Sequence, residues 1–155
     1  MINYTIRPIK ESEWEMAMQV VWDTFLVFEA PEYPRLGTES FRNFVWDPEL
    51  KRKFVRGDFP TYAAFVGDVI VGVVSVRDVS HVSLLFVDGQ YHNNGIARSL
   101  LRNLFAEQVR RYEIDRMTVN ASPYAVEFYH KIGFRDVNCE QTADGIRFTP
   151  MVIEL

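Results

Sequence analysis

The 155-residue chain contains a single cysteine, Cys139, so it cannot form an internal disulfide bond. This scarcity favours a reducing compartment, and we expect a cytoplasmic protein. The sequence also lacks an apolar run long enough for a transmembrane helix, and its first residues lack the apolar core of a signal peptide. We therefore expect no role at a membrane.

Basic residues are too few to give the chain a positive charge. The 17 lysines and arginines stand against 21 aspartates and glutamates, which gives a formal net charge of -4 at pH 7. This balance argues against nucleic acid as a partner, because phosphate binding needs a basic face. Apolar residues make up 48% of the chain, which excludes disorder and predicts one domain over residues 1–155.

The spacing of apolar residues predicts a mixed fold of strands and helices. Proline and glycine interrupt the pattern where one element gives way to the next. The expected order is β-α-α-β-β-β-α-β-α-β-β. Strands are expected at residues 3–8, 61–66, 69–76, 81–87, 116–121, 134–141 and 146–155, and helices at 11–29, 38–55, from 96 onward and 122–131.

The segment YHNNGIA, residues 91–97, joins an apolar strand to a helix. The first N–H groups of a helix and the positive end of its dipole form an anion site. Gly95 and Ala97 leave room for a phosphate, and Asn93 or Asn94 can cap the helix or adopt a left-handed conformation. An ordinary helix start accounts for the same residues, so this segment alone leaves both interpretations open.

A second motif lies downstream, in residues 119–134, VNASPYAVEFYHKIGF. Together with YHNNGIA and the strand between them, it resembles the GNAT superfamily of acyl-CoA-dependent N-acetyltransferases. That family carries a Gln/Arg-x-x-Gly-x-Gly/Ala loop after its fourth strand and an Ala-x-x-Phe/Leu-Tyr-x-Lys-x-Gly-Phe pattern on a later helix. Either motif alone is weak, whereas the two in this order are more specific.

The resemblance implies a fold and a reaction. The fold would be α/β or α+β, a mostly antiparallel twisted sheet of about seven strands flanked by about four helices, with strands 4 and 5 splayed apart. The pantetheine arm of coenzyme A would lie in that gap like a substitute strand. The reaction would transfer an acetyl group from acetyl-CoA, without a metal, to a primary amine of a small or amino-acid-like acceptor.

The resemblance also assigns coenzyme-binding residues. Backbone groups of Leu85, Phe86 and Val87 would line the pantetheine arm. Asn120 and Ser122 are both candidates for a further coenzyme contact, although helix capping is the alternative for Ser122. The pyrophosphate would be surrounded by His92, Asn93, Asn94, Gly95, Ile96, Ala97 and Arg98, with His92 standing where the family usually has glutamine or arginine.

Acetyl transfer needs a deprotonated amine, donors for the oxyanion and a proton for the leaving thiolate. By the resemblance, Tyr129 would be the general acid, while packing on the helix is the alternative. A backbone N–H near Val87 would serve the oxyanion. Some family members have a carboxylate base on the fifth strand, but the corresponding residue here is Met117, so we expect deprotonation through water.

In this family the first two helices usually form the acceptor wall. Here that region is rich in aromatic residues and acids, and Phe28, Glu29, Tyr33 and His81 are candidate acceptor residues. Core packing is the alternative for the aromatics, solvation for Glu29 and Glu32, and a structural role for His81. The sequence leaves open a non-catalytic acyl-CoA-binding or sensing module, an enzyme that acetylates protein N-termini or lysines, and a homodimer.

Overall fold

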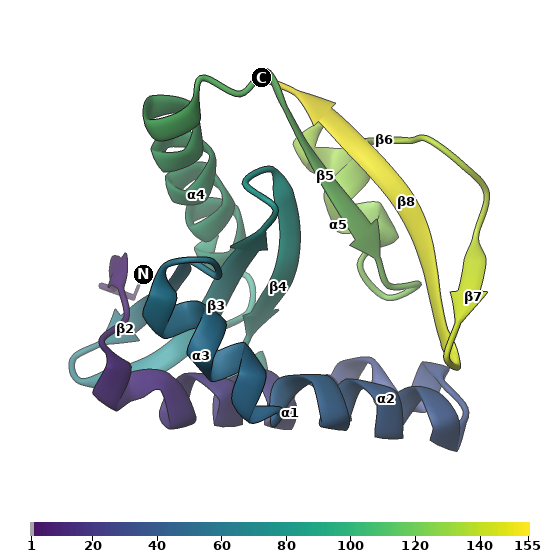
Figure 1. Ribbon diagram of the computed structural model, residues 1–155, viewed down its shortest axis with the longest axis horizontal. Coiled ribbons are helices and arrows are strands. Elements are labelled where there is room, and N and C mark those ends of the chain that lie inside the picture. Colours follow the sequence, from purple (N-terminus) through teal and green to yellow (C-terminus); the bar gives the residue numbers. More distant parts are fainter. Residues whose placement is uncertain (1) are drawn as a thin grey trace.

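Eight strands form one sheet with five α-helices around it in the computed structural model, which describes residues 2–155 (Figure 1). The helices are α1 (Trp14–Phe28), α2 (Arg35–Val45), α3 (Pro48–Arg56), α4 (Ile96–Tyr112) and α5 (Val126–Ile132). The strands are β1 (Thr5–Pro8), β2 (Thr61–Val66), β3 (Val69–Arg77), β4 (His81–Val87), β5 (Arg116–Ala121), β6 (Arg135–Asp136), β7 (Gln141–Ala143) and β8 (Ile146–Glu154). Among these described helices, none has the length and apolar character needed to cross a membrane.

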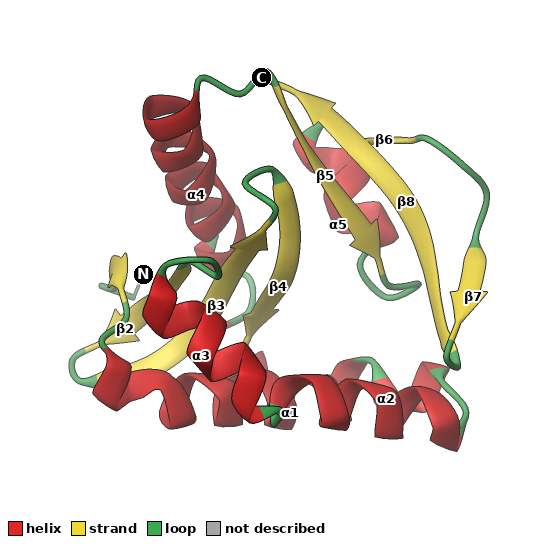
Figure 2. Ribbon diagram, viewed as in Figure 1, coloured by secondary structure: helices red, strands yellow, loops and turns green. Residues whose placement is uncertain are grey.

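The strand order is β1-β2-β3-β4-β5-β8-β6, with β7 paired to the N-terminal part of β8. All pairs are antiparallel except β4 and β5, which are parallel and are joined only at His81–Thr118 and Val82–Val119. Beyond these two pairs the strands diverge, and the opening widens toward α1 and α2 (Figure 2). The splay expected between the fourth and fifth strands is therefore confirmed.

Each face of the sheet carries its own apolar core. The alternation along β2 shows this, because Tyr62 and Ala64 pack in the cluster that includes α4 and α5, whereas Ala63 and Phe65 pack in the cluster that includes α1. Alternate residues of a strand point to opposite faces, so a continuous run of buried residues covers both sides. Both faces of β2, β3 and β4 are thus covered.

The prediction of one continuous helix over residues 38–55 is wrong. The structure has two helices there, because α2 ends at Val45 and α3 begins at Pro48. The Asp47 side chain accepts a hydrogen bond of 2.9 Å from the Glu49 backbone N–H, and proline suits the first turn of a helix. This break turns the chain so that α2 and α3 cover different parts of the sheet.

Two further expectations near the C-terminal half need correction. Helix α5 begins at Val126 and not at Ser122, whose backbone carbonyl accepts a hydrogen bond of 2.9 Å from the Ala125 N–H in the preceding turn. The strand predicted at 134–141 is interrupted, leaving the short strands β6 and β7. The interruptions raise the totals from the expected seven strands and four helices to eight and five.

Candidate active site

The loop between β4 and α4 holds two residues in left-handed backbone conformations. Asn93 has a φ of 64°, and Gly95 has a φ of 75° and occupies the N-cap position of α4. Asparagine and glycine tolerate this conformation best. The sequence therefore reverses the chain direction within a few residues and starts the helix directly beside the end of β4.

Side chains of the loop hold it in this shape. His92 Nε2 lies 2.7 Å from the carbonyl oxygen of Val87, which can only accept, so Nε2 carries the hydrogen. The His92 ring also stacks on Phe28 of α1, with 4.7 Å between ring centroids. Asn94 Nδ2 donates to the carbonyl oxygens of Tyr91 and His92, both at 3.1 Å. His92 and Asn94 thus order the loop internally.

The backbone N–H groups at the start of α4 remain available. Within residues 2–155, no hydrogen bond engages the N–H groups of Gly95, Ile96 or Ala97. These donors, with the positive end of the dipole of a 17-residue helix, favour an anion such as a phosphate. The absence of a side chain on Gly95 keeps the approach open, since a Cβ there would meet nothing within 4 Å.

A cavity of about 480 Å³ lies over this loop. The end of β4, the start of α4, the last turn of α1 and the β5–α5 connection form its walls. It brings together most of the predicted coenzyme residues, namely Leu85, Phe86, Val87, His92, Asn93, Gly95, Ile96, Ala97 and Arg98, and also Phe28 and Tyr129. Asn94, Asn120 and Ser122 do not line it.

Tyr129 projects from α5 into this cavity and is almost fully buried, with 5% of its surface exposed. Its hydroxyl makes no hydrogen bond to any residue in the described part of the chain. Burial raises the pKa of Tyr129 far above its ordinary value, and the charge of Glu29 raises it further. The phenol therefore keeps its proton at neutral pH.

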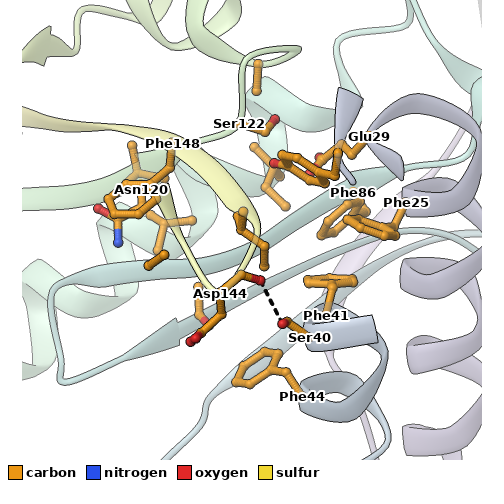
Figure 3. Close-up of a pocket in the computed structure, with 18 of the residues that line it drawn as sticks. Phe25, Glu29, Ser40, Phe41, Phe44, Phe86, Asn120, Ser122, Asp144 and Phe148 are labelled. Carbon is orange, nitrogen blue, oxygen red and sulfur yellow. Dashed lines mark hydrogen bonds between the residues drawn. The ribbon is translucent and has the colours of Figure 1, made fainter. Parts of the chain in front are cut away.

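A second cavity, of about 380 Å³, adjoins the first (Figure 3). Its walls come from α1, α2, β4, β5 and the β7–β8 hairpin. Asn120, Ser122 and Tyr33 line this cavity rather than the first one. The two cavities share a small set of residues, which marks the place where they meet: Glu29, Leu85, Phe86, Ala125 and Tyr129.

Glu29, the residue that follows α1, is the ionisable acid at this meeting point. Burial raises its pKa to about 7, the Ser122 hydroxyl partly opposes the increase, and the charge of Glu32 adds to it. The buried Ser122 oxygen lacks a full hydrogen bond in the described residues, so we treat it as a near neighbour of the carboxylate and not as a bonded partner. The Glu29 residue keeps partial solvent exposure, whereas Glu32 is exposed.

His81 lies outside both cavities. It sits at the start of β4, where its Nδ1 lies 2.8 Å from the Thr118 hydroxyl of β5. Burial lowers its pKa to about 4, and the charge of Arg77 lowers it further. The neutral ring bridges β4 and β5 where they still pair, which is a structural role. Nowhere in residues 2–155 do three or more His, Cys, Asp or Glu residues gather as a metal site would require.

Several lining residues escaped the sequence analysis. Tyr124 lies in the first cavity, where it packs against Phe28 with 5.2 Å between ring centroids. Asp144 and Phe148 enter the second cavity from the β7–β8 hairpin. Neither motif contains the hairpin residues, which reach the site through the pairing of β8 with β5 and through contacts of the hairpin with α2. Tyr124 falls within the second motif, but its position carried no distinct signal.

Solved structures share this fold over nearly the whole chain. A GCN5-related N-acetyltransferase from Rhodopseudomonas palustris has a TM-score of 0.86 at 22% identity, covering 100% of this chain and 98% of the other. PaiA N-acetyltransferase from Thermoplasma acidophilum, in complex with coenzyme A, has a TM-score of 0.81 at 19% identity, with coverage of 99% and 100%. An aminoglycoside 6'-N-acetyltransferase complexed with coenzyme A has a TM-score of 0.69 at 14% identity, with coverage of 97% and 96%. These similarities define the class of fold.

The family follows from the sequence. Residues 29–155 match the family model described as "Acetyltransferase (GNAT) domain". Because this match spans most of the chain, the protein belongs to the GNAT acetyltransferase family, as its two motifs had indicated. Comparison with curated proteins gave no significant match.

Proposed function

We propose that this protein is an N-acetyltransferase that transfers an acetyl group from acetyl-CoA to the primary amine of a small molecule. The observation that carries the proposal is the meeting of two cavities at Glu29 and Tyr129, beside the opening between β4 and β5. One cavity takes the coenzyme and the other takes the amine. Both substrates are then bound together, and the amine attacks the thioester directly.

The proposed coenzyme site combines an anion site with an open strand. The pyrophosphate lies at the free N–H groups of Gly95, Ile96 and Ala97, where the α4 dipole favours negative charge. The pantetheine arm lies along the part of β4 that no longer pairs with β5 and bonds to its backbone. Two solved structures with this fold are complexes with coenzyme A, which supports coenzyme binding by this chain.

Glu29 accepts the proton of the incoming ammonium, in place of the water chain expected from the sequence. A carboxylate with a pKa of about 7 is a far better base at neutral pH than an ordinary glutamate. The neutral nitrogen then attacks the thioester carbonyl, the C–N bond forms and the C–S bond breaks. Tyr129 protonates the leaving thiolate, and backbone N–H groups at the end of β4 stabilise the oxyanion.

The proton balance closes without any further reactant. The ammonium loses two protons in becoming an amide, and one of them appears on the thiol of coenzyme A. The other proton leaves to solvent through Glu29. Tyr129 recovers its proton from the nitrogen of the tetrahedral intermediate, so both residues return to their starting states.

Two measurements test the proposal. Release of free thiol from acetyl-CoA is followed with a broad panel of amines, and coenzyme A binding is measured by titration calorimetry. We expect micromolar coenzyme binding and amine-dependent thiol release. Coenzyme binding without turnover across the panel would identify a non-catalytic acyl-CoA-binding module, and absence of coenzyme binding would leave only the fold in common with the family.

A further inference from the structure

Aromatic rings form the wall of the second cavity. Phe25 of α1 and Phe41 of α2 stack with 4.2 Å between ring centroids and 21° between planes. Phe86 of β4 packs beside Phe41 at 5.6 Å, and Phe44 and Phe148 complete the wall. Such a wall favours an apolar, flat body by burying its surface and by ring stacking.

The charges in this cavity are all negative. Two charged residues line it: Glu29, where the two cavities meet, and Asp144, an exposed residue of the hairpin that lies well apart from Glu29 and beside Ser40 (Figure 3). No lysine, arginine or histidine is among the residues that line it. The guanidinium of Arg147 is directed elsewhere, because it donates to the Glu32 carbonyl oxygen at 2.8 Å and lies near the carboxylates of Glu32 and Glu140. A cation is attracted here, whereas a carboxylate finds no cationic partner among the lining residues.

The β7–β8 hairpin closes this cavity on one side. The Ser40 hydroxyl donates to the Asp144 carbonyl oxygen at 2.8 Å, and the Tyr33 hydroxyl donates to the Arg147 carbonyl oxygen at 3.3 Å. Gly37 packs directly against Gly145. With a volume of about 380 Å³, the cavity lies at the lower end of the range for small-molecule pockets. It suits one ring and a short chain better than a polypeptide.

We propose that the acceptor is a primary amine carried on an aromatic body and lacking a carboxylate, that is, an arylalkylamine. This inference rests on the proposed N-acetyltransferase function and names the substrate class of its acceptor site. The ring packs against Phe41 and Phe86, and the buried Phe25 supports Phe41 from behind. The ammonium reaches Glu29, where it loses its proton and meets the thioester.

A set of matched amines tests the proposal on the intact protein. We compare 2-phenylethylamine with L-phenylalanine, which adds a carboxylate, and with L-phenylalaninamide, which adds a neutral group of similar size. Propylamine lacks the ring, and putrescine replaces it with a second ammonium. A tripeptide with N-terminal phenylalanine represents a protein acceptor. We expect kcat/KM for 2-phenylethylamine to exceed that for L-phenylalanine at least about 100-fold and that for propylamine at least about tenfold.

Two variants locate the selectivity in this cavity. Phe41→Ala should lower kcat/KM for 2-phenylethylamine about tenfold while changing that for propylamine far less, because only the ring loses its contact. Asp144 has a left-handed φ of 52°, which asparagine also tolerates. Asp144→Asn should therefore leave the turn intact and reduce the ratio of kcat/KM for 2-phenylethylamine to that for L-phenylalanine about threefold. Asp68→Asn, at an exposed position that lines neither cavity, is the matched control and should leave this preference unchanged.

The outcomes separate this inference from the proposed function. Equal or better turnover of L-phenylalanine, propylamine, putrescine or the tripeptide overturns the arylalkylamine assignment and leaves an N-acetyltransferase of another substrate class. If coenzyme A binds but no amine is acetylated, the proposed function fails. Calorimetry on the coenzyme-loaded protein then decides the inference by itself, since binding of 2-phenylethylamine but not L-phenylalanine supports the cavity assignment, and any other pattern overturns it.

Discussion

Gly37 of α2 and Gly145 of the β7–β8 turn pack backbone against backbone. A Cβ on Gly37 would overlap the carbonyl oxygen of Gly145, and a Cβ on Gly145 would overlap the Gly37 nitrogen. This contact joins α2 to the hairpin that closes the second cavity. Two residues without side chains therefore set the distance between two walls of the proposed acceptor site.

Gly37→Ala should force these walls apart. Alanine favours the helix by about 1 kcal/mol, but overlap with a rigid backbone costs about 1 to 3 kcal/mol, so we expect a net loss of stability of about 1 kcal/mol. The KM for the acceptor should rise while the Kd for coenzyme A stays constant. Urea unfolding and steady-state kinetics measure both effects. Leu36→Ala, at the neighbouring exposed position, is the control, and equal behaviour of the two variants would contradict the role of the contact.

Tyr129→Phe removes the proposed acid while keeping the ring that packs on Phe134, at 5.1 Å between centroids. We expect kcat to fall about 100-fold, because thiolate would leave without a positioned proton donor. The Kd for coenzyme A should change less than about threefold, since no binding contact is lost. Stopped-flow thiol release and calorimetry give the two values. A large loss of coenzyme affinity with little change in kcat would instead make Tyr129 a binding residue.

Glu29→Gln should remove the base and its signature in the pH profile. In the native enzyme kcat/KM should rise with pH and level off above about 7, where the Glu29 carboxylate is ionised. The variant should lose this inflection and about 100-fold or more in rate at neutral pH. The profile is measured with an amine at constant ionic strength. An inflection that persists in the variant would assign the base to another group.

The same substitution should raise stability at alkaline pH. Folding raises the pKa of Glu29 from 4.5 to about 7, so the folded chain retains a proton that the unfolded chain has released. The contribution of Glu29 to stability is therefore greatest below pH 4.5, falls as pH rises toward 7, and stays lower above it. Glutamine carries no such penalty, and we expect the variant to be more stable at pH 8 by roughly 1 to 3 kcal/mol. Urea unfolding at pH 5 and pH 8 checks this, and equal shifts at both pH values would contradict it.

The elements predicted correctly from the sequence are those with local signals. Gly133 ends α5 with a φ of 119°, and Asp144 and Gly145 form the turn before β8, both at positive φ. The strand at 116–121 and the loop at 91–97 also lie where their residues predict. In each case the deciding interactions fall within a few residues, so pattern and spacing suffice to place the element.

The error at Ser122 arose because distant contacts override a local preference. Ser122 followed by Pro123 has the form of a helix start, but the Ser122 side chain lies near Glu29 instead of capping α5. Burial of Glu29 depends on the β5–α5 connection packing over the end of α1, and nothing in its neighbouring residues indicates it. The Pro48 break was missed because helical spacing continues on both sides of it. The sequence named Glu29 as a candidate acceptor residue, but its position between the two cavities follows only from the tertiary structure.

His92→Ala should weaken coenzyme binding without touching the reacting atoms. The substitution removes both the hydrogen bond to the Val87 carbonyl oxygen, at 2.7 Å, and the stack on Phe28. The loop then loses the order that holds its N–H groups toward a phosphate, and we expect the Kd for coenzyme A to rise about tenfold. His92→Gln keeps a donor and should recover part of the loss. His130→Ala is the control, because His130 is exposed, does not line the coenzyme cavity, and lies 2.7 Å from the Asp136 carboxylate. Calorimetric titration of coenzyme A measures all three variants, and an unchanged Kd in His92→Ala would show that the loop keeps its shape through Asn94 and the backbone alone.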